Sequence, residues 1–257
     1  MSTTLRCPTC EAPLRDSRLG ARCRNQHRFP AIDGYIDLLP DDDQSGTASV
    51  FETVYGRLYD GGVQRPTVAR ASARVLWGAE LREMYELMER GAHGHGLTIV
   101  DVPVGGAPVL RQAGSTLNCE YVGVDLSHAM LRRAADLCKK RGIEDAVLIR
   151  ADATHLPFAD ASVDRILCFN GLHVIPDKEA VVAEFARVLR PGGEIWGSVL
   201  VRPRSRLTRV IRPWTIRPFW FFHPADAEAL AAMAHSAGFK RWKQTDHGAV
   251  MIFRGRR

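Results

Sequence analysis

The sequence has no apolar run near the length needed to cross a membrane. A spanning helix takes roughly 20 predominantly apolar residues, and no such stretch occurs among the 257 residues. The amino-terminal residues also lack the apolar core of a secretory signal. These absences predict a protein of the reducing cytoplasm, in which the six cysteines do not form a disulfide framework.

The sequence also has no acidic residue between Ile195 and Ala225. Six arginines within residues 202–217 carry a charge equal to the whole net charge of +6. Aromatic side chains are interleaved with them, so the segment suits either phosphates and stacked RNA bases or the wall of an apolar pocket. A solvated amphipathic cover is the third interpretation. The arginines are Arg202, Arg204, Arg206, Arg209, Arg212 and Arg217, and the aromatics are Trp214, Phe219, Trp220, Phe221 and Phe222.

Two close pairs of metal-ligand residues lie near the amino terminus, separated by about a dozen residues. The first pair is Cys7 and Cys10, and the second is Cys23 and His27. Three thiolates and one imidazole suit a tetrahedral zinc ion, and a closed site of four protein ligands is structural. Residues 29–36 then predict two short strands joined by a turn at Asp33 and Gly34. We therefore predict a zinc-ribbon domain over residues 1–40 and a solvated linker over residues 41–48.

Beyond the linker, apolar runs alternate with helical patterns, which predicts a parallel, doubly wound sheet. The predicted strands are residues 97–100, 121–124, 146–151, 163–169 and 194–201. Ser127 and Asp177 are the predicted N-caps of helices over residues 129–141 and 178–189, and another helix covers residues 225–237. The last two predicted strands, 239–245 and 249–253, are joined so closely that they must be antiparallel.

Chemistry-bearing residues follow the predicted parallel strands, at the sheet edge where open α/β sheets bind ligands. Asp101 precedes the small-residue loop of Gly105 and Gly106, and Asp125 follows the next strand. An acid in the position of Asp125 can accept both hydroxyls of a ribose. Two further strands end on such residues. After the third strand, the side chain of Asp152 can accept from an adenine amine while Ala153 offers a backbone N–H, and Asn170 follows the fourth.

These runs resemble the class I S-adenosylmethionine-dependent methyltransferases of type 11 over residues 45–257. The likeness is carried by IVDVPVGGA, YVGVDLSHAMLRRA, RADATHLPFADASVDRILCFNGLHVIPD and FARVLRPGG. It implies a Rossmann-like sheet of seven strands, mostly parallel with a carboxy-terminal antiparallel hairpin. Separately, CPTC and CRNQHRFPAIDGYIDLLP resemble the zinc-binding amino terminus of the bacterial rRNA guanine-N1 methyltransferases.

The first resemblance also implies roles for individual residues toward S-adenosylmethionine. Asp101, Gly105 and Gly106 would line the methionine end, and Asn170 the region near the sulfonium. Asp125 and Leu126 would hold the ribose and adenine, and Asp152 and Ala153 the adenine edge. The sequence departs from the family at Pro103 and Ala107, where glycine is usual.

A catalytic base is required only for a poorly acidic acceptor, and His173 is the one candidate in position. A structural histidine at the rim is the alternative for that residue. No Asn-Pro-Pro-Tyr signature of an adenine-amine methylase occurs.

Three functions follow. The first is methylation of a small-molecule or lipid-like acceptor, with residues 49–257 as the catalytic domain and residues 202–223 as a substrate cover. The second is methylation of rRNA or tRNA, with the 202–217 arginines on the phosphates. The third is a non-catalytic binding module that keeps the fold.

Overall fold

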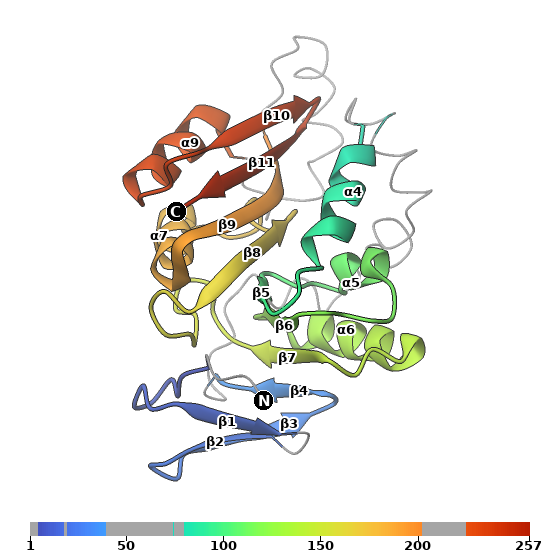
Figure 1. The fold of residues 1–257 in the computed structure, drawn as a ribbon, viewed down its shortest axis with the longest axis vertical. Coiled ribbons are helices and arrows are strands. Elements are labelled where there is room, and N and C mark those ends of the chain that lie inside the picture. Colours follow the sequence, from blue (N-terminus) through green and yellow to red (C-terminus); the bar gives the residue numbers. More distant parts are fainter. Residues whose placement is uncertain (1–4, 18–19, 40–73, 75–79, 202–224) are drawn as a thin grey trace.

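The computed structural model describes residues 5–17, 20–39, 74, 80–201 and 225–257 (Figure 1). The predicted linker over residues 41–48 and the predicted substrate cover over residues 202–223, with its arginines, lie outside the described residues. Within the described ranges, no helix combines the length and apolar character needed to cross a bilayer.

Seven strands form the predicted mixed sheet, in the order β7-β6-β5-β8-β9-β11-β10. The first five are parallel neighbours, and β11 runs antiparallel to both β9 and β10. The predicted seven-stranded, doubly wound arrangement is therefore confirmed. The strands are β5 (Thr98–Asp101), β6 (Glu120–Asp125), β7 (Ala146–Arg150), β8 (Val163–Phe169), β9 (Leu189–Leu200), β10 (Lys243–His247) and β11 (Val250–Arg256).

The zinc-ribbon segment extends this same sheet. Its strands are β1 (Leu14–Ser17), β2 (Gly20–Cys23), β3 (Arg28–Ile32) and β4 (Tyr35–Asp37). Strand β4 pairs in parallel with β7, through Ile36 opposite Ile149 and Asp37 opposite Arg150. The predicted turn at Asp33 and Gly34 joins β3 to β4, with both residues at positive φ. In Figure 1 the ribbon therefore lies directly beyond β7, at one edge of the sheet.

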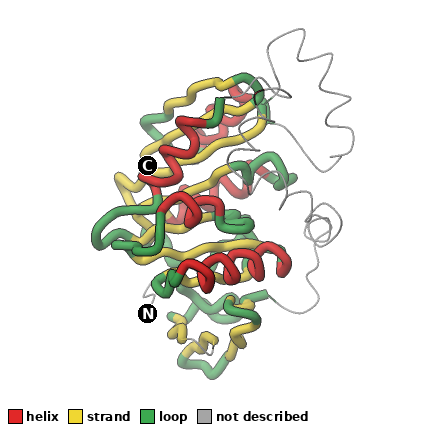
Figure 2. The backbone as a smooth tube through the Cα atoms, turned by 90° about the vertical axis from the view of Figure 1, so that its right-hand side faces the viewer, coloured by secondary structure: helices red, strands yellow, loops and turns green. Residues whose placement is uncertain are grey.

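Helices cover both faces of the sheet (Figures 1 and 2). One face packs on α4 (Arg82–Gly91), α5 (Pro108–Ala113) and α6 (His128–Arg141), and the other on α7 (Lys178–Val188) and α9 (Ala227–Ser236). Two apolar clusters result, one on each face, and strands contribute alternate residues to them, such as Ile99 to one and Val100 to the other. Leu5, Leu14 and Leu38 of the ribbon join the cluster that contains α7. The ribbon thus shares an apolar cluster with the larger sheet.

Local capping residues set the helix boundaries as predicted. The Ser127 hydroxyl accepts from the Met130 N–H at 3.4 Å, and α6 ends at Gly142 in a left-handed conformation. The Asp177 carboxylate caps α7 in the same way, accepting from the Ala180 N–H at 2.9 Å. These caps satisfy backbone N–H groups that have no partner inside the helix.

Strand β9 differs from the prediction, because it begins at Leu189 rather than Glu194. Val163 of β8 pairs with Leu189 and Arg165 pairs with Glu194, so the four residues 190–193 bulge out opposite Asp164. Gly192 takes a positive φ there, and its N–H donates to the Arg257 carbonyl at 2.9 Å. The Arg-Pro-Gly-Gly stretch is therefore a bulge within the strand, held by the distant carboxy-terminal residue.

Candidate functional site

The predicted ligand-binding residues lie in a row along one edge of the sheet. Strands β7, β6, β5 and β8 are adjacent and parallel, so their carboxyl ends meet at that edge. The segments that follow these ends carry Asp152, Asp125, the 102–107 loop and Asn170, respectively. Strand order reverses between β5 and β8, and such a reversal is where open α/β sheets bind their ligands.

Asp125 is the best-defined group of this edge. One carboxylate oxygen accepts from the Gly105 N–H at 2.8 Å and the other from the Ser127 N–H at 2.9 Å. The residue is 8% exposed, and burial raises its pKa to about 6 although the amides of Ser127, Gly105 and Leu126 lower it. A carboxylate offers about four lone-pair positions, so each oxygen retains one for a ribose hydroxyl. These acceptor positions therefore fit the ribose of a nucleoside.

The loop that follows β5 is shaped by backbone conformation. Gly105 has φ +52° and Ala107 has φ +59°, both in the left-handed region that glycine adopts freely. Ala107 stands where the resembled family has glycine, and its conformation explains that preference. Pro103 packs on the loop after β8, since a Cβ added to Gly171 would lie 2.1 Å from the proline Cδ. Gly171 therefore makes room for the other departure, Pro103.

Asp101 lies beneath this loop and is almost fully buried. Its carboxyl group accepts a hydrogen bond of 2.5 Å from the Tyr121 hydroxyl. Desolvation raises the pKa of Asp101 to about 8, so the group is mainly neutral at pH 7. Asp101 pairs across the strands with Gly123, where an added Cβ would lie 2.8 Å from Leu148 and 2.9 Å from Val104, so this glycine makes room for those two side chains. Sequence reasoning missed Tyr121, because its bond to Asp101 joins two strands that lie 20 residues apart along the chain.

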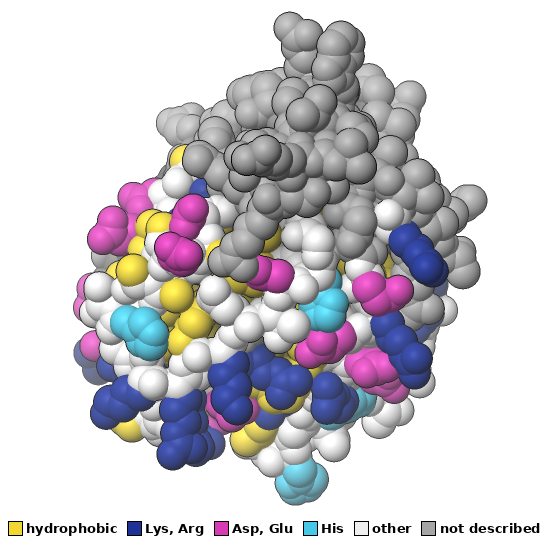
Figure 3. Space-filling view, turned by 90° about the horizontal axis from the view of Figure 1, so that it is seen from above, with side chains coloured by type: hydrophobic (Ala, Val, Ile, Leu, Met, Phe, Trp, Pro, Cys, Tyr) yellow, Lys and Arg dark blue, Asp and Glu magenta, His cyan; other side chains and the backbone are white. Residues whose placement is uncertain are grey.

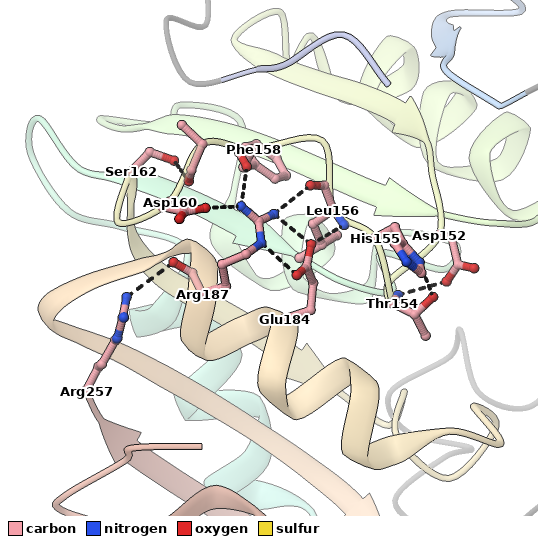
Figure 4. A network of polar contacts seen from close by, with 11 residues as sticks. Asp152, Thr154, His155, Leu156, Phe158, Asp160, Ser162, Glu184, Arg187 and Arg257 are labelled. Carbon is pink, nitrogen blue, oxygen red and sulfur yellow. Dashed lines mark hydrogen bonds and ion pairs between the residues drawn. The ribbon is translucent and has the colours of Figure 1, made fainter. Parts of the chain in front are cut away.

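The residues predicted to face the adenine lie on a loop that is tied to helix α7 (Figure 4). The Asp152 carboxylate accepts from the Thr154 N–H at 2.8 Å, and Ala153 beside it is half-buried. Further along the loop, Arg187 donates to the carbonyls of Leu156 at 3.0 Å and Phe158 at 2.9 Å. This network fixes the path of the chain after Asp152.

Glu184 completes the network in Figure 4. It accepts from the Leu156 N–H at 2.6 Å and pairs with Arg187 at 2.7 Å. The exposed carboxylate of Asp160 also pairs with Arg187, at 2.5 Å. Sequence reasoning missed Arg187 and Glu184, because their partners lie about 30 residues away along the chain.

Asn170 has φ +54° and contacts two neighbouring elements. Its side-chain oxygen Oδ1 accepts from the Ser198 hydroxyl at 3.1 Å, and its side-chain nitrogen Nδ2 lies 3.5 Å from the Met84 sulfur of α4. The structure therefore holds Asn170 at the end of β8 through β9 and α4. Leu126, next to Asp125, is half-buried at the same edge.

His173 is 4% exposed and lies behind this edge. Its Nδ1 accepts from the Leu200 N–H at 3.5 Å, and desolvation, helped by the charge of Lys178, lowers its pKa to about 3. Such a weak base takes up a proton poorly at neutral pH. These contacts favour the structural interpretation of His173, whose catalytic role stays a prediction.

The four predicted zinc ligands form a cluster. The ligand atoms of Cys7, Cys10, Cys23 and His27 all lie within 4.8 Å of one another. A tetrahedral zinc with Zn–S bonds of about 2.3 Å places its ligand atoms about 3.8 Å apart, so the cluster fits the ion. The Cys10 sulfur also accepts from the Asn25 side-chain amide at 3.3 Å. Asn25 is a supporting contact that the ligand spacing did not reveal.

The fold and the site together define a doubly wound α/β domain with a nucleoside-cofactor edge, joined to a Cys₃His zinc ribbon. Comparison with known families agrees with both parts. Residues 100–197 match the family described as the methyltransferase domain, and residues 5–45 match the RlmA amino-terminal zinc ribbon. Over residues 100–197 the chain is therefore similar to the methyltransferase domain, and over residues 5–45 it is similar to the RlmA ribbon.

Two curated relatives illustrate the likeness. Methyltransferase GfsG of Streptomyces halstedii is 39% identical over 116 residues, which are 44% of this chain and 40% of that protein. The chain thus covers well under half the length of that relative. The ubiquinone/menaquinone biosynthesis C-methyltransferase UbiE of Stutzerimonas stutzeri is 27% identical over 86% of this chain and 93% of its own length.

Solved structures share the fold. A possible histamine N-methyltransferase from Thermotoga maritima superposes with a TM-score of 0.55 and 19% identity, covering 82% of this chain and 99% of that one. The comparisons thus identify S-adenosylmethionine as the cofactor of this domain and zinc as the ion of the ribbon.

Proposed function

We propose that this protein transfers the methyl group of S-adenosylmethionine to a small-molecule or lipid-like acceptor. The observation that carries the proposal is the Asp125 carboxylate, held by the N–H groups of Gly105 and Ser127 beside the glycine loop. This arrangement presents free acceptor positions on a fixed, buried carboxylate. It suits the two neighbouring hydroxyls of a ribose.

The remaining residues of the edge take the roles that their positions support. Asp152 and the Ala153 N–H would bind the adenine edge, and Leu126 would pack against the nucleoside. Gly105 and Gly106 allow close approach of the methionine end. Asn170, which contacts Ser198 and Met84, would lie near the sulfonium.

When bound, S-adenosylmethionine would supply an activated methyl carbon, which the nucleophile of the acceptor attacks in line while S-adenosylhomocysteine leaves with the electrons of the broken carbon–sulfur bond. The chain's own contribution is to align donor and acceptor and to exclude water. Asp101 supports the site indirectly, because its bond to Tyr121 holds the start of the loop that carries Gly105.

The acceptor class rests on the relatives. The UbiE protein, which aligns along most of both chains, is named for quinone biosynthesis, and this favours an apolar, lipid-like acceptor here too. The predicted substrate cover over residues 202–223 lies outside the described residues and stays a prediction. A cytoplasmic location stays a prediction.

RNA methylation is the second candidate, favoured by the match of residues 5–45 to the RlmA ribbon family. On the face seen in Figure 3, Lys and Arg side chains gather along the lower rim, an arrangement that suits an anionic partner. Steep weakening of RNA binding with salt would support this candidate, because each neutralised phosphate releases counterions.

The test is transfer of tritium from methyl-labelled S-adenosylmethionine into cell extract, separated into RNA, protein and solvent-soluble fractions. Our proposal predicts label in the solvent-soluble fraction. Label in RNA would replace it with the second candidate. An Asp125→Ala variant serves as the control for transfer by contaminating enzymes, and tight cofactor binding without transfer to any fraction would indicate a non-catalytic binding module.

A further inference from the structure

The zinc ribbon contacts the cofactor edge of the methyltransferase domain at two places. Strand β4 pairs with β7, and the Leu38 N–H donates to the Arg150 carbonyl at 3.1 Å. At the other place, the Arg6 N–H donates to the Pro157 carbonyl at 2.8 Å. Arg150 and Pro157 flank the segment that carries Asp152 and Ala153.

A buried ion pair crosses the first of these contacts. The Arg150 Nη1 lies 3.2 Å from both carboxylate oxygens of Asp37, and the two side chains are 2% and 8% exposed. Asp37 also accepts from the Leu39 N–H at 3.1 Å. Because both side chains are buried, water screens their electrostatic attraction less than it screens that of a surface pair.

The same guanidinium reaches the ribose side of the cofactor edge. Arg150 Nε donates to the Leu126 carbonyl at 3.1 Å, one residue after Asp125. His128, two residues further, meets the ribbon directly, since its Nδ1 lies 2.5 Å from the Tyr35 hydroxyl and its Nε2 lies 4.0 Å from Asp37. The turn between Asp125 and helix α6 is thus held from the ribbon side at Leu126 and at His128.

We infer that Asp37 and Arg150 are positioning residues for the cofactor, through which the ribbon holds the 125–128 turn in its binding conformation. Arg150 holds the Leu126 carbonyl and so orients the peptide between Leu126 and Ser127. The N–H of that peptide donates to the Asp125 carboxylate. Without the ribbon's carboxylate, the guanidinium would lose its two bonds to Asp37 and would hold the Leu126 carbonyl less firmly, so that the cofactor would have to order more of the turn. This inference rests on the proposed cofactor site, and it gives the ribbon a part in the function of that site.

The test compares binding of S-adenosylhomocysteine by calorimetry in the zinc-loaded full chain. The double variant Asp37→Leu/Arg150→Met removes both charges together, which avoids leaving an unpaired buried charge. We expect its dissociation constant to rise by about tenfold or more, with one zinc per chain retained. In turnover assays the KM for the methyl donor should rise while kcat changes less than about twofold.

Tyr35→Phe provides a second variant, because it removes only the hydroxyl that meets His128; a smaller rise in the same constant is expected. The matched control is Arg132→Met, which breaks the exposed ribbon contact of Arg132 with Asp33 at 3.2 Å and does not touch Leu126. It should bind as wild type does. Binding within twofold of wild type by both the double variant and Tyr35→Phe would overturn the inference. Absence of binding by wild type would instead overturn the proposed cofactor site.

Discussion

Asp125 combines burial with hydrogen bonds in a way that fits a ligand-binding group. Burial raises its pKa to about 6, whereas the two backbone amides favour the ionised form. Hydrogen bonds to a charged group contribute about 1.5–3 kcal/mol each. A nucleoside that donates two hydroxyls to this carboxylate would therefore gain much of its affinity here.

We expect Asp125→Ala to weaken S-adenosylhomocysteine binding by at least about 100-fold, because two charged hydrogen bonds are lost. Calorimetry measures the affinity, and circular dichroism checks that the fold is retained. Asp145→Ala removes an exposed carboxylate just before β7 and should leave the affinity unchanged. Unchanged affinity in Asp125→Ala would remove the ribose assignment.

The raised pKa of Asp101 predicts that the free energy of unfolding depends on pH. Its folded pKa of about 8 lies above the unfolded value near 3.9. Its contribution is therefore fully present below about pH 4 and is lost as the pH rises toward 8. Compared with Asp101→Asn, the wild type should lose about 1.4 kcal/mol of unfolding free energy per pH unit between pH 5 and 7.

Urea unfolding of both proteins at pH 5, 6 and 7 tests this slope. Asp136→Asn, at an exposed position on α6, is the control and should show no such trend. A difference between wild type and Asp101→Asn that stays constant over this range would contradict the assigned protonation of Asp101.

At the scale of elements, the loop from Asp152 to Ser162 depends on α7. Arg187→Met would remove two bonds to carbonyls and leave Glu184 without its ion pair. We expect a loss of about 2 kcal/mol in unfolding free energy and faster amide exchange in this loop. Arg82→Met, which breaks the exposed pair with Glu86 on α4, should cost about 0.5 kcal/mol or less. Equal losses in the two variants would contradict the special role of Arg187.

Elements with local signals could be predicted from the sequence, and those without could not. Helices α6 and α7 begin at polar caps that the sequence displays. Helix α5 escaped prediction, because it has six residues and its N-cap is Ala107, which makes no side-chain cap. The bulge in β9 was missed since its shape depends on Arg257, far along the chain.

In the candidate site, too, residues with a local sequence signal were predictable, and contacts between distant segments were not. Asp125 and Asp152 were predictable because each acid follows a buried strand directly, and parallel strands bring such acids to one edge. The contact of Pro103 with Gly171 and the bond of Arg150 to Leu126 join segments that only the folded chain brings together. No spacing within the sequence reports them.

For the whole molecule, the main addition of the structure is that the ribbon continues the methyltransferase sheet. The cysteine and histidine spacing predicted the ribbon, but its pairing with β7 depends on the shape of an edge that several distant strands create. The ribbon also shares its apolar core with the cluster around α7. Loss of zinc should therefore lower the stability of elements beyond residues 5–38.

We expect Cys7→Ser to reduce the zinc content from about one ion per chain to well below half, since one of four ligands is changed. The melting temperature should fall together with amide protection in β4 and β7. Cys119→Ser, outside the ligand cluster, is the matched control and should keep its zinc. A wild-type protein that contains no zinc when prepared without chelators would refute the metal assignment.

A crystal structure of the chain with S-adenosylhomocysteine tests the central claim most directly. We predict the nucleoside at the carboxyl ends of β5, β6 and β7, with both ribose hydroxyls within hydrogen-bond distance of the Asp125 carboxylate. The adenine should lie between Leu126 and the Asp152–Ala153 segment. A nucleoside bound at another place, with Asp125 bonded only to Gly105 and Ser127, would contradict the assigned site.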